Sequence, residues 1–101
     1  MIIERTEFKI KFGKMKEALA IWKEIFEQFK DAKDKPKVRI LTDLTGPSYT
    51  LILEMSLRSF QDIGFKNYQW MTNEKAVELY KQVVPLCESA SRTLYTIEFE
   101  N

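Results

Sequence analysis

The sequence predicts one α+β domain in which two helices cover the same face of a four-stranded antiparallel sheet. Hydrophobic residues alternate with period two in four segments of the chain, which is typical of strands. Two stretches between these segments repeat their hydrophobic residues with the helical period instead. The chain has 101 residues with three Gly and three Pro, so we expect residues 1–101 to share one core without a flexible linker.

The first half of the chain predicts a strand, a helix and then two more strands. Apolar and polar residues alternate over Ile2–Lys11, whereas Lys14–Lys33 has apolar residues at helical spacing and Pro36 ends this helix. Lys37–Asp43 and Tyr49–Leu57 alternate again. The turn between them contains the Gly-Pro pair at residues 46 and 47, which predicts an antiparallel hairpin.

The second half of the chain predicts a helix that is split or kinked and a last strand. A helical stretch begins at Ser59, which is a good N-cap, and ends near Ala90. Asn73 can cap a fresh segment within it, and Pro85 should kink it because proline has no N–H. Thr93–Glu100 alternates once more. The resulting order, β-α-β-β-α-β, is the split βαβ or ferredoxin-like plan.

The two faces of the predicted sheet differ in polarity, because the helices cover one of them. We expect the covered face to carry the side chains of Phe8, Ile10, Val38, Ile40, Leu51, Leu53, Met55, Tyr95, Ile97 and Phe99. The other face, called the open face below, carries the aliphatic residues Ile3, Leu41 and Ile52 among a polar cluster of Arg5, Glu7, Arg39, Glu54 and Glu98. With the first and third strands at the centre, opposite charges on neighbouring strands can form ion pairs.

Two interpretations of the open face compete. The first is a solvated sheet surface crossed by weak ion pairs. The second is that two such sheets stack face to face in a homodimer and enclose a partly polar interior. We favour the homodimer, because Ile3, Leu41 and Ile52 would otherwise be exposed on the middle of an open sheet, and a small domain gains most from covering them.

Composition excludes several classes of function. The chain has no His, so histidine acid–base catalysis, Ser–His or Cys–His nucleophile pairs and histidine-ligated metal or haem are excluded. A net charge of +1 does not favour a nucleic-acid binder. We expect no membrane span, no metal site and no cofactor. Cys87, expected on the apolar stripe of the last helix, is the single Cys, which predicts a cytoplasmic protein without an intrachain disulfide.

The opening strand, the Phe12-Gly13-Lys14 entry into the first helix and the segment Glu54–Leu57 resemble the dimeric α/β-barrel superfamily. So does the aromatic stretch Asn67–Met71 before the last helix. This superfamily includes NIPSNAP-like proteins and antibiotic-biosynthesis-type monooxygenases. The resemblance covers the whole chain and rests on architecture. It implies a homodimer whose sheets pack into a barrel, with a small pocket between each sheet and its helices.

The resemblance also implies candidate pocket residues. Asn67 and Trp70 resemble the Asn and Trp that related pockets use on the second helix, and Tyr68 lies between them. These aromatic residues are also explained as core or interface anchors. Arg5, Arg39 and Glu54 can bind an anionic or hydroxylated ligand inside a barrel, or simply form structural ion pairs.

Two functions therefore remain in view. The first is a homodimeric α/β-barrel protein that binds a small organic ligand, with a monooxygenase-like activity on an aromatic or quinone-like compound as its enzymatic form. The second is a non-catalytic structural or regulatory dimerisation module. The haem-degrading branch of the superfamily is disfavoured, because it needs a histidine ligand and the chain has none.

Overall fold

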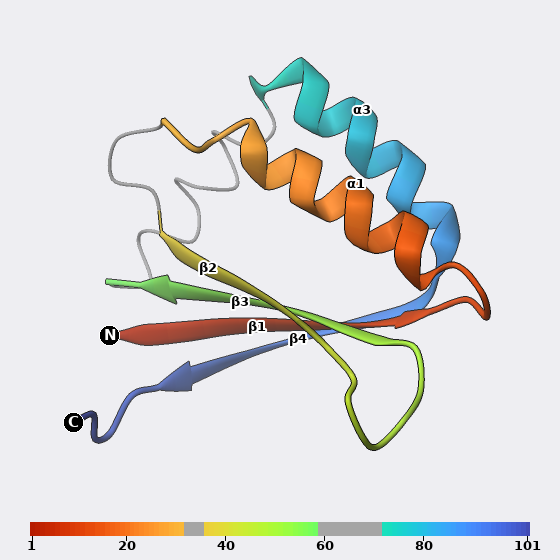
Figure 1. Ribbon diagram of the computed structural model, residues 1–101. Helices are drawn as coiled ribbons and strands as arrows, with labels where there is room; N and C mark the ends of the chain where they lie inside the picture. The colour runs from red at the N-terminus through yellow and green to blue at the C-terminus, as the bar shows by residue number, and fades with distance from the viewer. Residues whose placement is uncertain (32–35, 59–71) are drawn as a thin grey trace.

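The computed structural model describes residues 1–31, 36–58 and 72–101, and these form two layers (Figure 1). One layer is a four-stranded sheet, and the other is a pair of helices on one face of it. The order of the elements and their layers confirm the predicted ferredoxin-like α+β fold.

The sheet has the order β2-β3-β1-β4, and each neighbouring pair is antiparallel. The strands are β1 (Ile2–Ile10), β2 (Lys37–Thr42), β3 (Thr50–Leu57) and β4 (Cys87–Thr96). β1 and β3 are therefore central, as the sequence predicts. Because β1 is paired on both sides, its side chains define the two faces of the sheet.

The helices of the described residues are α1 (Met15–Glu27) and α3 (Glu74–Val83), which lie side by side above the sheet (Figure 1). The predicted cap at Asn73 is confirmed, since its side chain accepts a hydrogen bond of 2.8 Å from the N–H of Ala76. α1 ends earlier than predicted. The N–H of Phe29 bonds to the carbonyl of Phe26, so the chain tightens into a turn.

The core lies between the helices and the sheet. Each of three residues from different elements is fully buried: Ile25 of α1, Leu51 of β3 and Ala76 of α3. Hydrophobic side chains from β1, β3, α1 and α3 thus close the covered face of the sheet. The sequence prediction of a helix-covered apolar face is confirmed for Phe8, Ile10, Leu51 and Leu53.

The prediction was wrong for the end of the chain. The last helix ends at Val83 and a short 3-10 turn (Val84–Leu86) follows, because Pro85 cannot donate the hydrogen bond that a continuing helix needs. Cys87 therefore begins β4 instead of lying on a helix. The strand starts and ends earlier than expected, so residues 97–101 lie beyond it.

This shift changes which side chains share a face. Tyr95 pairs with Ile3 and so lies on the open face, not on the covered face as predicted, and it is 49% exposed. Glu98 lies beyond β4 and is exposed, outside the predicted polar cluster of the sheet. Phe99 is 84% exposed instead of forming part of the core.

Candidate functional site

The middle of the open face carries a group of charged residues on β1, β3 and the edge strand β2. Arg5 lies directly opposite Glu54 in the β1–β3 register, and Arg39 lies opposite Glu54 in the β2–β3 register. The Arg39 guanidinium forms an ion pair with the Glu54 carboxylate, whose side chain is largely buried. The predicted neighbourhood of these three residues is therefore present in the fold.

Arg5 and Glu7 differ from this pair. The Arg5 side chain is half-buried on β1, and within the described residues no side chain forms a hydrogen bond or ion pair with it. Glu7 is exposed on the same face, and the described part of the chain offers it no bonded partner either. Among the described residues, Arg5 and Glu7 thus present an unpaired positive and an unpaired negative charge, two residues apart on a central strand.

The loop between β2 and β3 projects on the side of the open face (Figure 1). Hydrogen bonds hold it: the Asp43 carboxylate accepts the N–H of Thr50 at 3.0 Å, and the N–H of Asp43 donates to the carbonyl of Thr50 at 3.1 Å. The Thr50 hydroxyl donates to the carbonyl of Pro47 at 2.9 Å, and the Lys9 ammonium donates to the carbonyl of Ser48. Gly46 has a φ of 92°, a conformation that favours glycine. These bonds tie the loop to β1 and β3, so that it forms a wall beside the open face.

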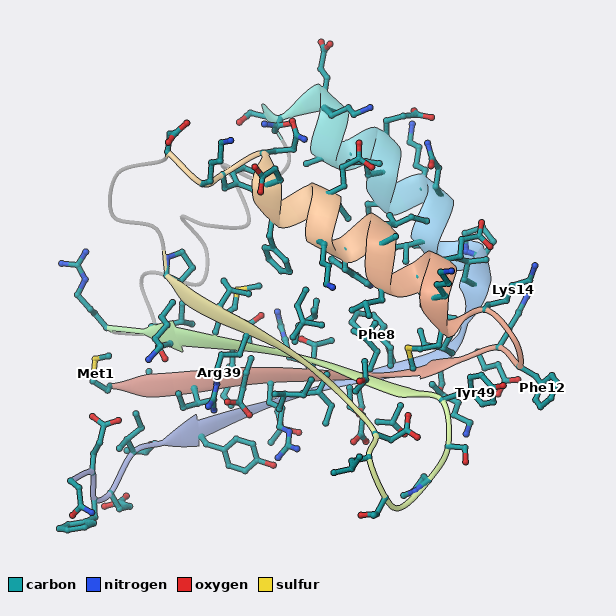
Figure 2. All side chains as sticks on the ribbon, in the orientation of Figure 1. Met1, Phe8, Phe12, Lys14, Arg39 and Tyr49 are labelled. Carbon is teal, nitrogen blue, oxygen red and sulfur yellow. The ribbon has the colours of Figure 1, made fainter. Side chains whose placement is uncertain are left out.

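Tyr49 ends this loop with a φ of 63°, which is strained for a residue with a side chain. Its ring lies 5.2 Å from that of Phe12, and its carbonyl accepts the N–H of Ile10 at 2.8 Å. Figure 2 shows Phe12 and Tyr49 together at the end of the molecule where β1 ends. The hydrogen bond from β1 therefore holds Tyr49 in this strained backbone conformation.

A hollow of about 440 Å³ lies between this loop and β4 on the open face. Its lining includes Glu7, Ile52 and Ser91 from the sheet and Asp43 and Pro47 from the loop. The lining is rich in hydroxyl and carboxylate groups over an apolar floor. Such a surface can accept hydrogen bonds from a hydroxyl group while its floor packs against a hydrocarbon ring.

An aromatic group marks the interior between sheet and helices. The Trp22 ring lies 5.3 Å from Phe8, 6.0 Å from Phe26 and 6.1 Å from Tyr80. Trp22 is 4% exposed, and its indole N–H is buried without a hydrogen-bond acceptor among the described residues. A buried donor without a partner is uncommon and costs free energy, so this N–H is a candidate contact for a bound group that carries an oxygen.

The predicted pocket residues Asn67, Tyr68 and Trp70 lie outside the described residues, so their role stays a prediction. Of the predicted polar cluster, the fold brings Arg5, Glu7, Arg39 and Glu54 onto one face and leaves Glu98 beyond it. Sequence reasoning missed the contribution of the β2–β3 loop to the open face. Asp43 just before the Gly-Pro turn was the available signal, because Asp side chains commonly cap such turns.

Cys87 and the carboxylates do not form a metal centre in the described ranges, where no three possible ligands come together. Cys87 is half-buried, its Sγ lies 3.5 Å from the carbonyl oxygen of Val83, and burial raises the pKa of its thiol despite the nearby Lys11 charge. Among residues 1–31, 36–58 and 72–101, no helix is long and apolar enough to cross a membrane.

Known structures share this fold. Over the whole of both chains, a NIPSNAP domain protein from Burkholderia xenovorans superposes with a TM-score of 0.81 at 15% identity. A NIPSNAP family protein from Agrobacterium tumefaciens has a TM-score of 0.81 at 18% identity, with 94% of this chain and 90% of that chain covered. A candidate antibiotic biosynthesis monooxygenase from Nitrosomonas europaea has a TM-score of 0.77 at 13% identity, covering 98% of this chain and 100% of that one.

No family model matches the chain, and no curated protein matches it by sequence. The chain therefore has the ferredoxin-like fold that NIPSNAP proteins share with antibiotic biosynthesis monooxygenase-like proteins. This confirms the resemblance that the sequence suggested at the level of the fold.

Proposed function

We propose that the chain works as a homodimer joined through the open face and binds a small organic molecule between sheet and helices. Ligand binding is supported by the buried indole N–H of Trp22, which has no acceptor among the described residues. The apolar side chains on the open face support the homodimer.

The open face supports a second copy of the chain because it is neither fully polar nor fully exposed. Ile3 and Leu41 are half-buried and Ile52 is 9% exposed, although no helix of the described residues covers this side. Tyr95 adds an exposed aromatic ring beside Ile3. Covering these side chains with an identical sheet would remove apolar surface from water at both copies.

A concentration series in sedimentation velocity tests the homodimer. We expect the unmodified chain to sediment as a dimer at micromolar concentration and Leu41→Glu to sediment as a monomer, because a carboxylate at this position would be buried in the interface. Gln82→Glu on α3 adds the same charge away from the open face and should leave the dimer unchanged. If the unmodified chain sediments as a monomer at all concentrations, the proposed homodimer is wrong.

The ligand is proposed to be an aromatic or quinone-like compound with an oxygen that accepts the Trp22 N–H. Phe8 and Phe26 would contact its ring, since both lie within about 6 Å of the Trp22 ring. Asn67, Tyr68 and Trp70 are proposed to contribute to the same site. The monooxygenase-like name carried by the Nitrosomonas europaea relative motivates the further proposal that the bound compound is oxidised by O₂ without metal or flavin.

Tryptophan fluorescence tests the ligand, because the chain has two Trp and each can be removed in turn. We expect quinones or polyphenols to quench emission, and Trp22→Phe to weaken the binding roughly tenfold through loss of the N–H donor. Trp70→Phe keeps that donor and reports whether position 70 contacts the ligand. Oxygen uptake with the bound compound then tests the oxidation.

If the chain is a dimer whose tryptophan fluorescence none of these compounds quenches, the non-catalytic dimerisation module is favoured instead. This alternative is supported by the apolar residues of the open face, which dimerisation would bury whether or not a ligand binds. Dimerisation and ligand binding are thus measured separately, and either can fail without the other.

A further inference from the structure

The open face has two unlike ends. At one end Ile3 pairs with Tyr95, and at the other Lys9 pairs with Ser89 beside the hollow and its loop wall. The first end presents a half-exposed aromatic ring, and the second presents a hollow of about 440 Å³. A surface with a projection at one end and a hollow at the other can match a second copy of itself if the copy runs in the reverse direction.

We propose that, in the homodimer, a two-fold axis crosses the strands at right angles near Thr6, so that Tyr95 of each subunit closes the hollow of the other. This inference rests on the homodimer proposed above and specifies its register. Because the two ends of β1 lie at equal distances from Thr6, such an axis brings Tyr95 to the level of the partner's Ser89. The Tyr95 ring would then lie over the β4 side of the hollow, which the partner's Ser89, Ala90 and Ser91 line.

The same axis brings Arg5 of each subunit to Glu7 of the other. Arg5 and Glu7 are each one residue from Thr6, so Arg5 comes to the level of the partner's Glu7, and this happens twice by symmetry. Neither side chain has a bonded partner in the described part of its own subunit. A half-buried guanidinium needs an acceptor, and an exposed carboxylate two residues away on an identical copy supplies one.

The hollow also suits the phenol of Tyr95. A buried tyrosine hydroxyl needs a hydrogen-bond partner, and the hollow presents the Asp43 and Glu7 carboxylates and the Ser91 hydroxyl. Lys9 does not block it, because its ammonium is held by the carbonyl of Ser48 in the loop.

An axis parallel to the strands is the competing register. It would place β1 over the partner's β3 and β4 over the partner's β2, because β3 and β1 are the two central strands. Arg5 would then meet the partner's Glu54, and Tyr95 would meet the partner's Lys37. This register is disfavoured, because Glu54 is largely buried and already paired with Arg39, and because it leaves the hollow without Tyr95.

Engineered disulfides separate the two registers. In a Cys87→Ser background, Tyr95→Cys with Ser89→Cys should give covalent dimers on oxidation, whereas Tyr95→Cys with Lys37→Cys should not. Positions 95 and 89 lie in one strand about 20 Å apart, too far for a disulfide within one subunit. Covalent dimers from the 95/37 pair, or from neither pair in a chain that sediments as a dimer, would overturn the proposed axis.

Charge exchange provides an independent readout by sedimentation. Arg5→Glu and Glu7→Arg should each raise the dimer Kd by at least about tenfold, because each places like charges together at the interface. The double variant should return the Kd to within about threefold of the unmodified chain, as coupled charges do. Rescue of Arg5→Glu by Glu54→Arg instead would contradict the pairing with Glu7.

A monomeric unmodified chain would mean that the homodimer itself is wrong, whereas a dimer without these cross-links and without rescue would mean that only the axis is wrong. Tyr95→Ala should also weaken the dimer about tenfold. Leu94→Ala, the matched control, changes the adjacent residue, which is 37% exposed and points to the other face of the sheet, and should leave the Kd unchanged.

Discussion

The two faces of the sheet are built by the same strands but differ in how they are completed. The covered face is closed by α1 and α3, and its residues Leu51 and Ile10 are almost fully buried within one chain. The open face has no covering element among the described residues, and it mixes Ile52 with Arg5 and Glu54. Burial within one subunit is therefore concentrated on the covered face, whereas the open face keeps charged residues among its apolar ones.

Adjacent residues of β3 provide the largest test of this comparison. Leu51→Ala should cost about 3 kcal/mol in the free energy of unfolding, because it leaves a cavity in a core that cannot collapse around it. Ile52→Ala should cost less, about 2 kcal/mol, in the isolated subunit, because Ile52 is buried but lies outside the core cluster, where the neighbouring open face can relax around it. Urea denaturation measures both.

Protein concentration sharpens the same test. Stability of the unmodified chain should rise with concentration if the open face is covered by a second copy, since dimerisation stabilises the folded subunit. The Ile52→Ala variant should lose part of this dependence, whereas Leu51→Ala should keep it. Equal costs and equal concentration dependence for the two variants would remove the distinction between the faces.

The second prediction concerns the helix layer. Asn73→Ala should destabilise the chain by about 1 kcal/mol, because the N–H of Ala76 loses the side-chain acceptor that caps α3. Asn73→Asp keeps an acceptor and is the matched control. Thermal unfolding followed by circular dichroism measures the change. A loss of the same size in Asn73→Asp would show that the amide of Asn73 has another role.

The third prediction concerns the ion pair of the open face. Arg39→Met should cost less than about 1 kcal/mol, because the Arg39 side chain is 61% exposed and water screens the pair. Glu54→Gln should cost a similar amount, although Glu54 is more buried, because Gln keeps the shape and its hydrogen-bonding capacity. A much larger loss from Arg39→Met would show that the open face stabilises the subunit as strongly as the covered face.

The sequence predicted the order of elements and most of the covered face, because both depend on periodicity that extends over a whole segment. The strand order followed from the usual plan for this order of elements. Together these predicted the neighbourhood of Arg5, Arg39 and Glu54. The end of the chain was wrong because residues near Pro85 fit both the end of a helix and the start of a strand, and a shift of one residue moves Tyr95 to the other face. The hollow depends on how the β2–β3 loop folds back, which periodicity does not encode.

The smallest expected effect is the pH dependence that Cys87 adds at the covered edge of the sheet. Burial raises the pKa of this thiol above its ordinary value of 9.0, so the folded chain holds its proton more tightly than the unfolded chain does. The free energy of unfolding should therefore fall as the pH rises from about the unfolded pKa through the folded pKa.

Comparison with Cys87→Ala isolates this contribution, since other groups titrate in the same range in both proteins. The difference in unfolding free energy between the two should be constant below pH 8 and should shift against the unmodified chain above it. Alkylation by iodoacetamide should also be slower in the folded chain than in urea, because the thiolate is the reactive form. Equal alkylation rates in the two states would mean that the folded chain does not shield Cys87 at the start of β4.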